Sequence, residues 1–86
     1  MKYRIAFMIV QEKRLMSSLL YSPKGRTYDL VEPAIRDAEK QNALVKSLEY
    51  VVIGDGSLDI LWQKAGSRVP PNMRAREIQE IERASA

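Results

Sequence analysis

The chain has 86 residues, of which 45% are hydrophobic and 29% charged, and its formal net charge is +3. This length is enough for one small domain, and this composition is typical of a globular protein rather than a disordered one. The chain has neither cysteine nor histidine, which excludes disulfides, zinc sites of the ordinary type, Ser-His-Asp triads and Cys-His dyads.

Residues 2–10 predict a strand that the rest of the protein covers on both faces. Alternate side chains of a strand point to opposite sides of its sheet, and both sets are largely apolar after Arg4. One face carries Tyr3, Ile5, Phe7 and Ile9, and the other carries Arg4, Ala6 and Met8. Two apolar faces rich in β-branched and aromatic residues are typical of an interior strand.

The same segment bears on the cellular location. Its apolar run covers residues 5–10 and is followed by a polar, charged stretch at 11–14 rather than by a cleavage site of small residues. A membrane helix needs about 20 apolar residues, and the sequence contains no such stretch. We therefore expect a cytoplasmic protein with neither a signal peptide nor a membrane helix.

Residues 11–21 fit two structures, and the pattern leaves both open. The spacing of Leu15, Met16, Leu19 and Leu20 is that of a helix face. A returning strand over residues 15–21 is the preferred interpretation, because the Ser-Pro-Lys-Gly of residues 22–25 is typical of a type I turn between extended segments.

Residues 30–41 predict the central helix. Asp29 is a suitable N-cap, with Glu32 as its capping-box partner. Pro33 lies in the first turn, where its missing N–H is not needed. Asn42 is a suitable left-handed residue to end the helix.

A β-hairpin is predicted from residues 48–53 and 58–64, because Asp55-Gly56 between them is the strongest short-range hairpin signal. Regular alternation then pairs Ile53 with Leu58, Val51 with Ile60, and Glu49 with Trp62.

The glycine cluster of residues 54–57 also raises the hypothesis of a phosphate or metal site. The sequence lacks the GxxxxGK[S/T] of a phosphate loop, and Asp59 stands where a dinucleotide fingerprint requires glycine. A calcium loop starting at Asp55 would need glycine in place of Ile60 and an acid in place of Gly66. The cluster therefore predicts a turn, and we expect no metal and no cofactor.

The remaining residues predict a connector and a second helix. Residues 65–72 contain Gly66 and Pro70-Pro71, which stiffen a link and prevent regular strand pairing. Residues 73–84 predict a C-terminal helix capped by Asn72. Its narrow apolar stripe consists of Ala75, Ile78 and Ile81. Such a helix is marginal alone, so it must dock on the sheet or on another chain, and a homodimer through it is a further hypothesis.

Together these elements predict a single α+β domain over residues 1–86. A mainly antiparallel sheet of three to five strands carries the packed helix at 30–41, and the helix at 73–84 closes the domain or reaches outward.

The preferred functional hypothesis is a non-enzymatic protein-binding module, a small regulator, inhibitor or adaptor that occupies the surface of a partner protein. No acid has a visibly apolar setting that would raise its pKa for proton transfer, so we do not expect an enzyme. The candidate contact residues are Trp62, Tyr50, Ile78 and Ile81.

The alternative hypothesis is nucleic-acid binding, because residues 1–26 contain six basic residues and one acidic residue. The cations would contact phosphates while aromatic rings stack on bases. The candidates are Lys13, Arg14, Lys24 and Arg26 for phosphate and Tyr21 and Tyr28 for stacking, with Lys2 and Arg4 adding to the field.

Overall fold

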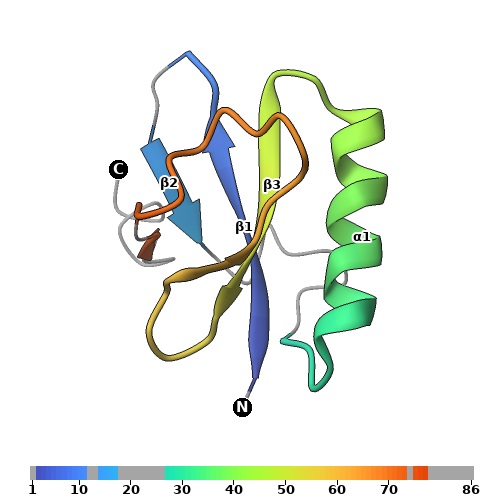
Figure 1. The fold of residues 1–86 in the computed structure, drawn as a ribbon, viewed down its shortest axis with the longest axis vertical. Helices are drawn as coiled ribbons and strands as arrows, with labels where there is room; N and C mark the ends of the chain where they lie inside the picture. The colour runs from blue at the N-terminus through green and yellow to red at the C-terminus, as the bar shows by residue number, and fades with distance from the viewer. Residues whose placement is uncertain (1, 12–13, 18–26, 74, 78–86) are drawn as a thin grey trace, which may run out of the picture.

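The computed structural model describes residues 2–11, 14–17, 27–73 and 75–77. Its elements in chain order are β1 (Tyr3–Ile9), β2 (Arg14–Ser17), α1 (Val31–Leu44), β3 (Leu48–Gly54), β4 (Ile60–Trp62) and β5 (Arg76–Glu77). The strands form one sheet in the order β4-β3-β1-β2-β5, with α1 alongside it (Figure 1). The predicted small α+β domain, with an antiparallel sheet and one packed helix, is therefore confirmed.

The pairing of β1 with β3 forms the centre of the sheet. The two strands are antiparallel, and all seven residues of β1 have a partner in β3, from Tyr3 opposite Gly54 to Ile9 opposite Leu48. Both strands are largely apolar on both faces, so each face needs a cover to keep it from water. The predicted strand at 2–10 and its two-sided burial are confirmed.

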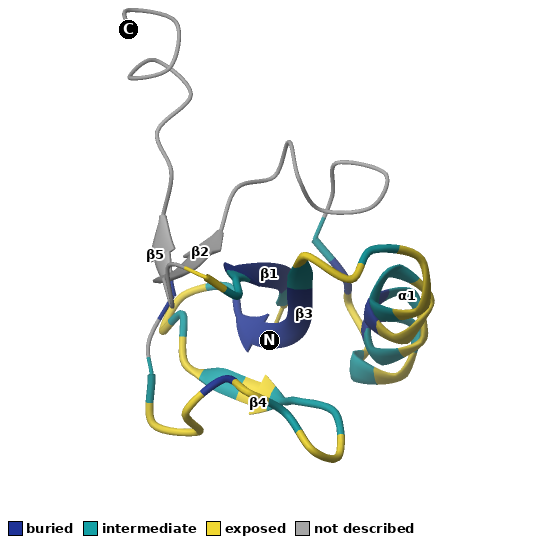
Figure 2. Cartoon of the chain, turned by 90° about the horizontal axis from the view of Figure 1, so that it is seen from above, coloured by how far each residue is buried: buried dark blue, intermediate teal, exposed yellow. Residues whose placement is uncertain are grey.

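Helix α1 covers one face of this central pair. Its fully buried residues, Ala34 and Ala38, are small and let the helix lie close to the sheet. They pack against a cluster of larger side chains from the strands and from the segment before the helix. Its buried members are Ile5, Phe7, Tyr28, Tyr50 and Val52. Figure 2 shows α1 on one side of β1 and β3.

The opposite face is covered without a helix. The chain after β4 returns across the sheet, and its residues Val69 and Ala75 are 2% and 4% exposed. They pack against the second buried cluster, which includes Ala6, Met8, Val51 and Ile53. The segment predicted as a connector at 65–72 thus contributes a fully buried side chain to the core.

Strand β2 pairs antiparallel with β1, with Phe7 opposite Met16. The preferred interpretation of residues 11–21 as a returning strand therefore holds for 14–17, and residues 18–21 lie outside the described ones. Towards the N-terminal end of β1, Tyr28 replaces β2 as the neighbour that pairs with this side of the strand. Tyr3 and Tyr28 exchange two backbone hydrogen bonds of 2.8 Å each.

The hairpin of β3 and β4 forms, but its predicted register is wrong. Ile53 lies opposite Ile60 and Val52 opposite Trp62, with a β-bulge between the two pairs. The turn is longer than a two-residue loop, because Gly54 bonds to both Leu58 and Asp59 through its backbone. Leu58 has a φ of 61°, a left-handed conformation that residues other than glycine seldom adopt.

The central helix forms, but its predicted ends are wrong. The N-cap is Leu30, which makes no side-chain capping bond, while Asp29 pairs with Lys2 instead. Pro33 is in the first turn as predicted, and the helix continues past Asn42 to Leu44. The amide of Asn42 is used elsewhere. It accepts a hydrogen bond from the N–H of Tyr50 at 2.7 Å and donates one to the C=O of Tyr50 at 3.1 Å.

The C-terminal helix predicted at 73–84 is absent from the residues that the structure describes. Met73 and Ala75 are not helical, and residues 76–77 form β5, which pairs parallel with β2. The backbone N–H of Ala75 bonds to the C=O of Leu58 at 3.0 Å, which holds this segment extended against the sheet. The thin apolar stripe offered a helix little burial, and tertiary pairing prevails over local propensity. Residues 78–84 lie outside the described ones. Among the described helices, none is long and apolar enough to cross a membrane.

Asn42→Ala tests the role of the Asn42 amide. The substitution removes the partners of both polar backbone groups of Tyr50 at a point that β4 does not reach. We expect the free energy of unfolding to fall by about 1–3 kcal/mol. Urea denaturation measures it.

Asn72→Ala is the matched control, because Asn72 is exposed in the loop after β4. It should change the free energy of unfolding by less than about 0.5 kcal/mol. Equal losses in the two variants would contradict the role assigned to Asn42.

Candidate functional site

The edge strand β4 carries a large apolar side chain that is exposed, Leu61. Leu61 is 45% exposed and lies in the β-bulge between the paired residues of β4. The bulge inserts one extra residue, so Ile60 and Trp62 fall on opposite faces with Leu61 between them. Ile60 packs against the second cluster. Trp62 packs against the cluster beneath α1 that includes Phe7 and Tyr50, which we name the helix-side cluster. We name the three residues Ile60–Trp62 the β4 edge.

The four candidate partner-binding residues are not brought together in the described part of the structure. Trp62 is half-buried and belongs to the β4 edge. Tyr50 is 8% exposed and is part of the helix-side cluster, where its ring lies 6.4 Å from that of Phe7. Ile78 and Ile81 lie outside the described residues.

Sequence reasoning missed three exposed leucines. Leu30, Leu44 and Leu61 are 64%, 71% and 45% exposed. Leu44 was missed because the helix was expected to end before it. Leu61 was missed because no residue marks a bulge in the run Asp59-Ile60-Leu61-Trp62, and regular alternation assigned Leu61 to the face of Val52.

The glycine cluster forms a turn, and its acidic residue, Asp55, makes an ion pair with Arg4. Arg4 donates from Nε to Oδ1 of Asp55 at 2.5 Å, and the guanidinium is largely buried. The N–H of Asp55 bonds to the C=O of Lys2 at 3.0 Å. Gly56 is exposed and has open space around it. The turn is therefore attached to the N-terminal end of β1.

The structure engages two of the six N-terminal cations in ion pairs. Arg4 pairs with Asp55, and Lys2 pairs with Asp29 at 2.7 Å. The hydrogen bond and the charge of Lys2 lower the pKa of Asp29, and Asp29 in turn raises the pKa of Lys2. Arg14 lies in β2. The other cations of the nucleic-acid hypothesis, Lys13, Lys24 and Arg26, lie outside the described residues, as does Tyr21.

Tyr28, the second predicted stacking residue, is a core residue. It is 4% exposed, and its hydroxyl donates to Oδ2 of Asp37 in α1 at 2.6 Å. This contact ties the segment before the helix to the helix itself. In this conformation its ring is enclosed rather than presented to a base.

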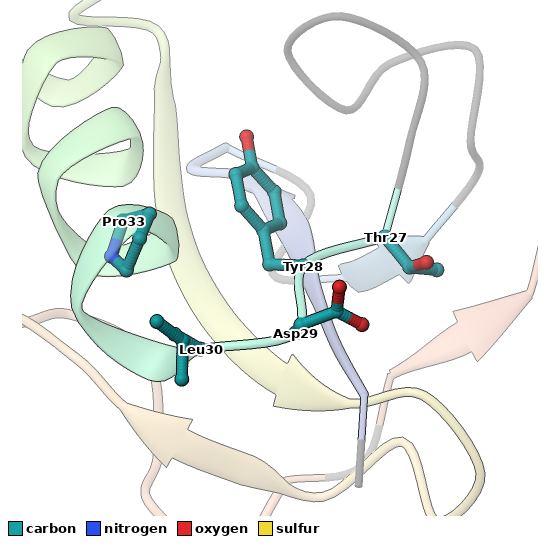
Figure 3. A pocket seen from close by; sticks show the side chains of 5 residues that line it. All are labelled: Thr27, Tyr28, Asp29, Leu30 and Pro33. Atoms are coloured by element: carbon teal, nitrogen blue, oxygen red, sulfur yellow. The ribbon is translucent and has the colours of Figure 1, made fainter.

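A shallow pocket lies beside this segment. Figure 3 shows it between residues 27–30 and the first turn of α1. Its lining residues are Thr27, Tyr28, Asp29, Leu30 and Pro33. The pocket adjoins the helix N-terminus, where side-chain capping is absent. Leu30 and Asp29 at its rim are both exposed.

The least expected polar residue is Glu49, which lies in β3 opposite Met8 and is 1% exposed. Its carboxylate accepts hydrogen bonds from the hydroxyl of Ser67 and from the backbone N–H of Arg68, the latter at 3.0 Å. Both donors come from the chain after β4. The expected pairing of Glu49 with Trp62 would have left it near the open edge, so its burial was not predicted.

Comparisons with known proteins provide no family for this chain. It matches no protein-family model, and no curated protein or solved structure shows significant similarity to it.

Tyr50→Phe tests whether burial of the Tyr50 hydroxyl beneath α1 makes its ionisation unfavourable in the folded state. Burial raises the pKa of Tyr50 above its ordinary value of 10.0, and its hydroxyl bonds to none of the described residues. Above that pH the unfolded chain loses the phenol proton while the folded chain keeps it, so the folded state loses stability as the pH rises.

We expect unfolding free energies of the wild type and Tyr50→Phe to be similar at pH 8, and the wild type to lose more stability between pH 10 and 11. Urea denaturation across this pH series measures the difference. Parallel curves would show that Tyr50 ionises equally easily in both states.

Proposed function

We propose that the protein is a non-enzymatic protein-binding module and that the β4 edge is its contact surface. The observation that carries the proposal is the outward placement of Leu61 on the edge strand, between two neighbours that are anchored in the core.

Anchoring matters because an ordered contact residue loses little conformational entropy on binding. Trp62 is held against the helix-side cluster and Ile60 against the second cluster. The backbone on either side of Leu61 is therefore fixed from both faces of the sheet. A partner would meet a preformed apolar side chain with the partly accessible ring of Trp62 next to it.

The shape of the edge favours recognition by side chains. The strand has three residues, and its bulge interrupts the regular row of backbone donors and acceptors. Short, bulged edge strands are poor templates for adding another strand. The partner surface that fits is an apolar pocket on a folded protein that receives Leu61, with a polar rim towards Lys64.

Nucleic-acid binding has less support among the described residues. Arg4 and Lys2 are committed to carboxylates, and the ring of Tyr28 is buried. Phosphate contacts would make binding fall steeply with salt, whereas an apolar contact would depend on salt only weakly.

A photo-crosslinking residue at position 64 tests the proposal. The variant protein is irradiated in extract from cells that produce the protein, and adducts are identified by mass spectrometry. Burying a leucine side chain stabilises a complex by about 1.5–3 kcal/mol. We therefore expect Leu61→Ser to reduce the yield of a specific protein adduct about tenfold or more.

Leu44→Ser is the matched control, since Leu44 is an exposed leucine at the end of α1, remote from β4 in sequence and element. It should leave the adduct unchanged. Equal loss in the two variants, or no saturable protein adduct, would contradict the proposal. An adduct that nuclease treatment removes would favour the nucleic-acid hypothesis.

A further inference from the structure

The second face of the sheet has an unusual cover, which we name the strap and define as residues 63–73. It has no helix and no strand, yet it places Val69, 2% exposed, into the cluster with Ala6, Met8, Val51 and Ile53. A segment of this kind buries apolar surface without the cooperative backbone ladder that holds a sheet together.

Side chains satisfy the polar groups where the strap crosses the sheet. The N–H of Val69 bonds to Oγ of Ser67 at 3.0 Å, and its C=O accepts from Nε2 of Gln63 at 2.6 Å. The hydroxyl of Ser67 in turn donates to the carboxylate of Glu49. Ser67 thus connects the buried residue of the strap to the strand beneath it.

Glu49 affects closure of the strap in two opposing ways, because closure gives its carboxylate hydrogen bonds but removes the carboxylate from water. Glu49 is 1% exposed, and neither ion pair among the described residues includes it. Burying a charge without a cation is costly unless hydrogen bonds compensate. The compensating donors that the structure shows are Ser67 and Arg68, both in the strap. Opening the strap would break these bonds but would let water reach the carboxylate.

The sheet beneath does not depend on the strap in the same way. Strands β1 and β3 are joined by seven consecutive residue pairs, and α1 stays packed on their other face. Opening the strap therefore removes one cover and leaves the central pair and the helix intact.

We propose that the strap is a latch-controlled cover that opens while the sheet and α1 stay folded, with Ser67 and Glu49 as the latch. Opening exposes part of the apolar face formed by Ala6, Met8, Val51 and Ile53. Opening of the strap does not require that the β4 edge bind a partner, so this proposal stands separately from the proposed function.

Thiol labelling tests the proposal directly, because the chain has no native cysteine. Ala6→Cys places a probe under the strap, and Ala38→Cys places one under α1. Both parent residues are 0% exposed. We expect Ala6→Cys to be labelled at least tenfold faster than Ala38→Cys at equal reagent concentration, with a rate that rises with urea less steeply than that of Ala38→Cys, because strap opening exposes less surface than global unfolding. Equal rates that rise together with urea would overturn the proposal, because both probes would then report global unfolding.

The latch is tested by adding Ser67→Ala to the Ala6→Cys protein. This substitution leaves the N–H of Val69 without its partner and removes one of the two donors to the Glu49 carboxylate, which keeps only the N–H of Arg68. Labelling should therefore rise about tenfold. Ser57→Ala is the control, because Ser57 accepts one long bond of 3.3 Å in the exposed turn. Equal effects of the two substitutions would overturn the assignment of the latch. Val51→Cys replaces Ala6→Cys as the probe if that variant does not fold.

Discussion

The antiparallel pairing of β1 with β3 is the constraint on which the rest of the structure depends. Its strands are largely apolar on both faces, so the one packed helix covers one face and the other face needs a second cover. Helix α1 covers one face with the small residues Ala34 and Ala38, and the strap covers the other with Val69.

The two covers are attached by different means. On the helix side, the amide of Asn42 substitutes for a neighbouring strand beside Tyr50, and Tyr28 links the segment before the helix to Asp37. On the strap side, the carboxyl oxygens of the buried Glu49 accept hydrogen bonds from Ser67 and Arg68. The helical cover adds polar partners at the edge of the core, whereas the strap donates hydrogen bonds to a buried side chain of β3.

The sequence predicted the elements that depend on nearby residues and failed where residues far apart in the sequence interact. Alternation in residues 2–10 and the Asp55-Gly56 turn are local patterns, and the strand, the hairpin and the central helix were correctly predicted. The register failed first at the turn, where Ile53 lies opposite Ile60 rather than Leu58, and again at the bulge. A bulge depends on fitting Ile60 and Trp62 to opposite faces of the finished sheet. The N-cap failed because Lys2, far away in the sequence, takes Asp29. The extended course at Met73 and Ala75 depends on the backbone of Leu58, which a local pattern does not reveal.

The candidate site was predicted less well than the fold, for the same reason. Trp62 was identified by its residue type, but the exposure of Leu61 and the burial of Tyr28 and Glu49 are set by tertiary contacts.

The bulge has a consequence for how this protein tolerates change. Ile60 and Trp62 already lie on opposite faces, which is the arrangement of consecutive residues in a regular strand. A hairpin lacking residue 61 would keep both neighbours where they are. The fold therefore does not need Leu61, and the identity of this side chain can change without repacking the core. Selection on position 61 can therefore act through the molecules that contact its side chain, without a conflicting demand from the core.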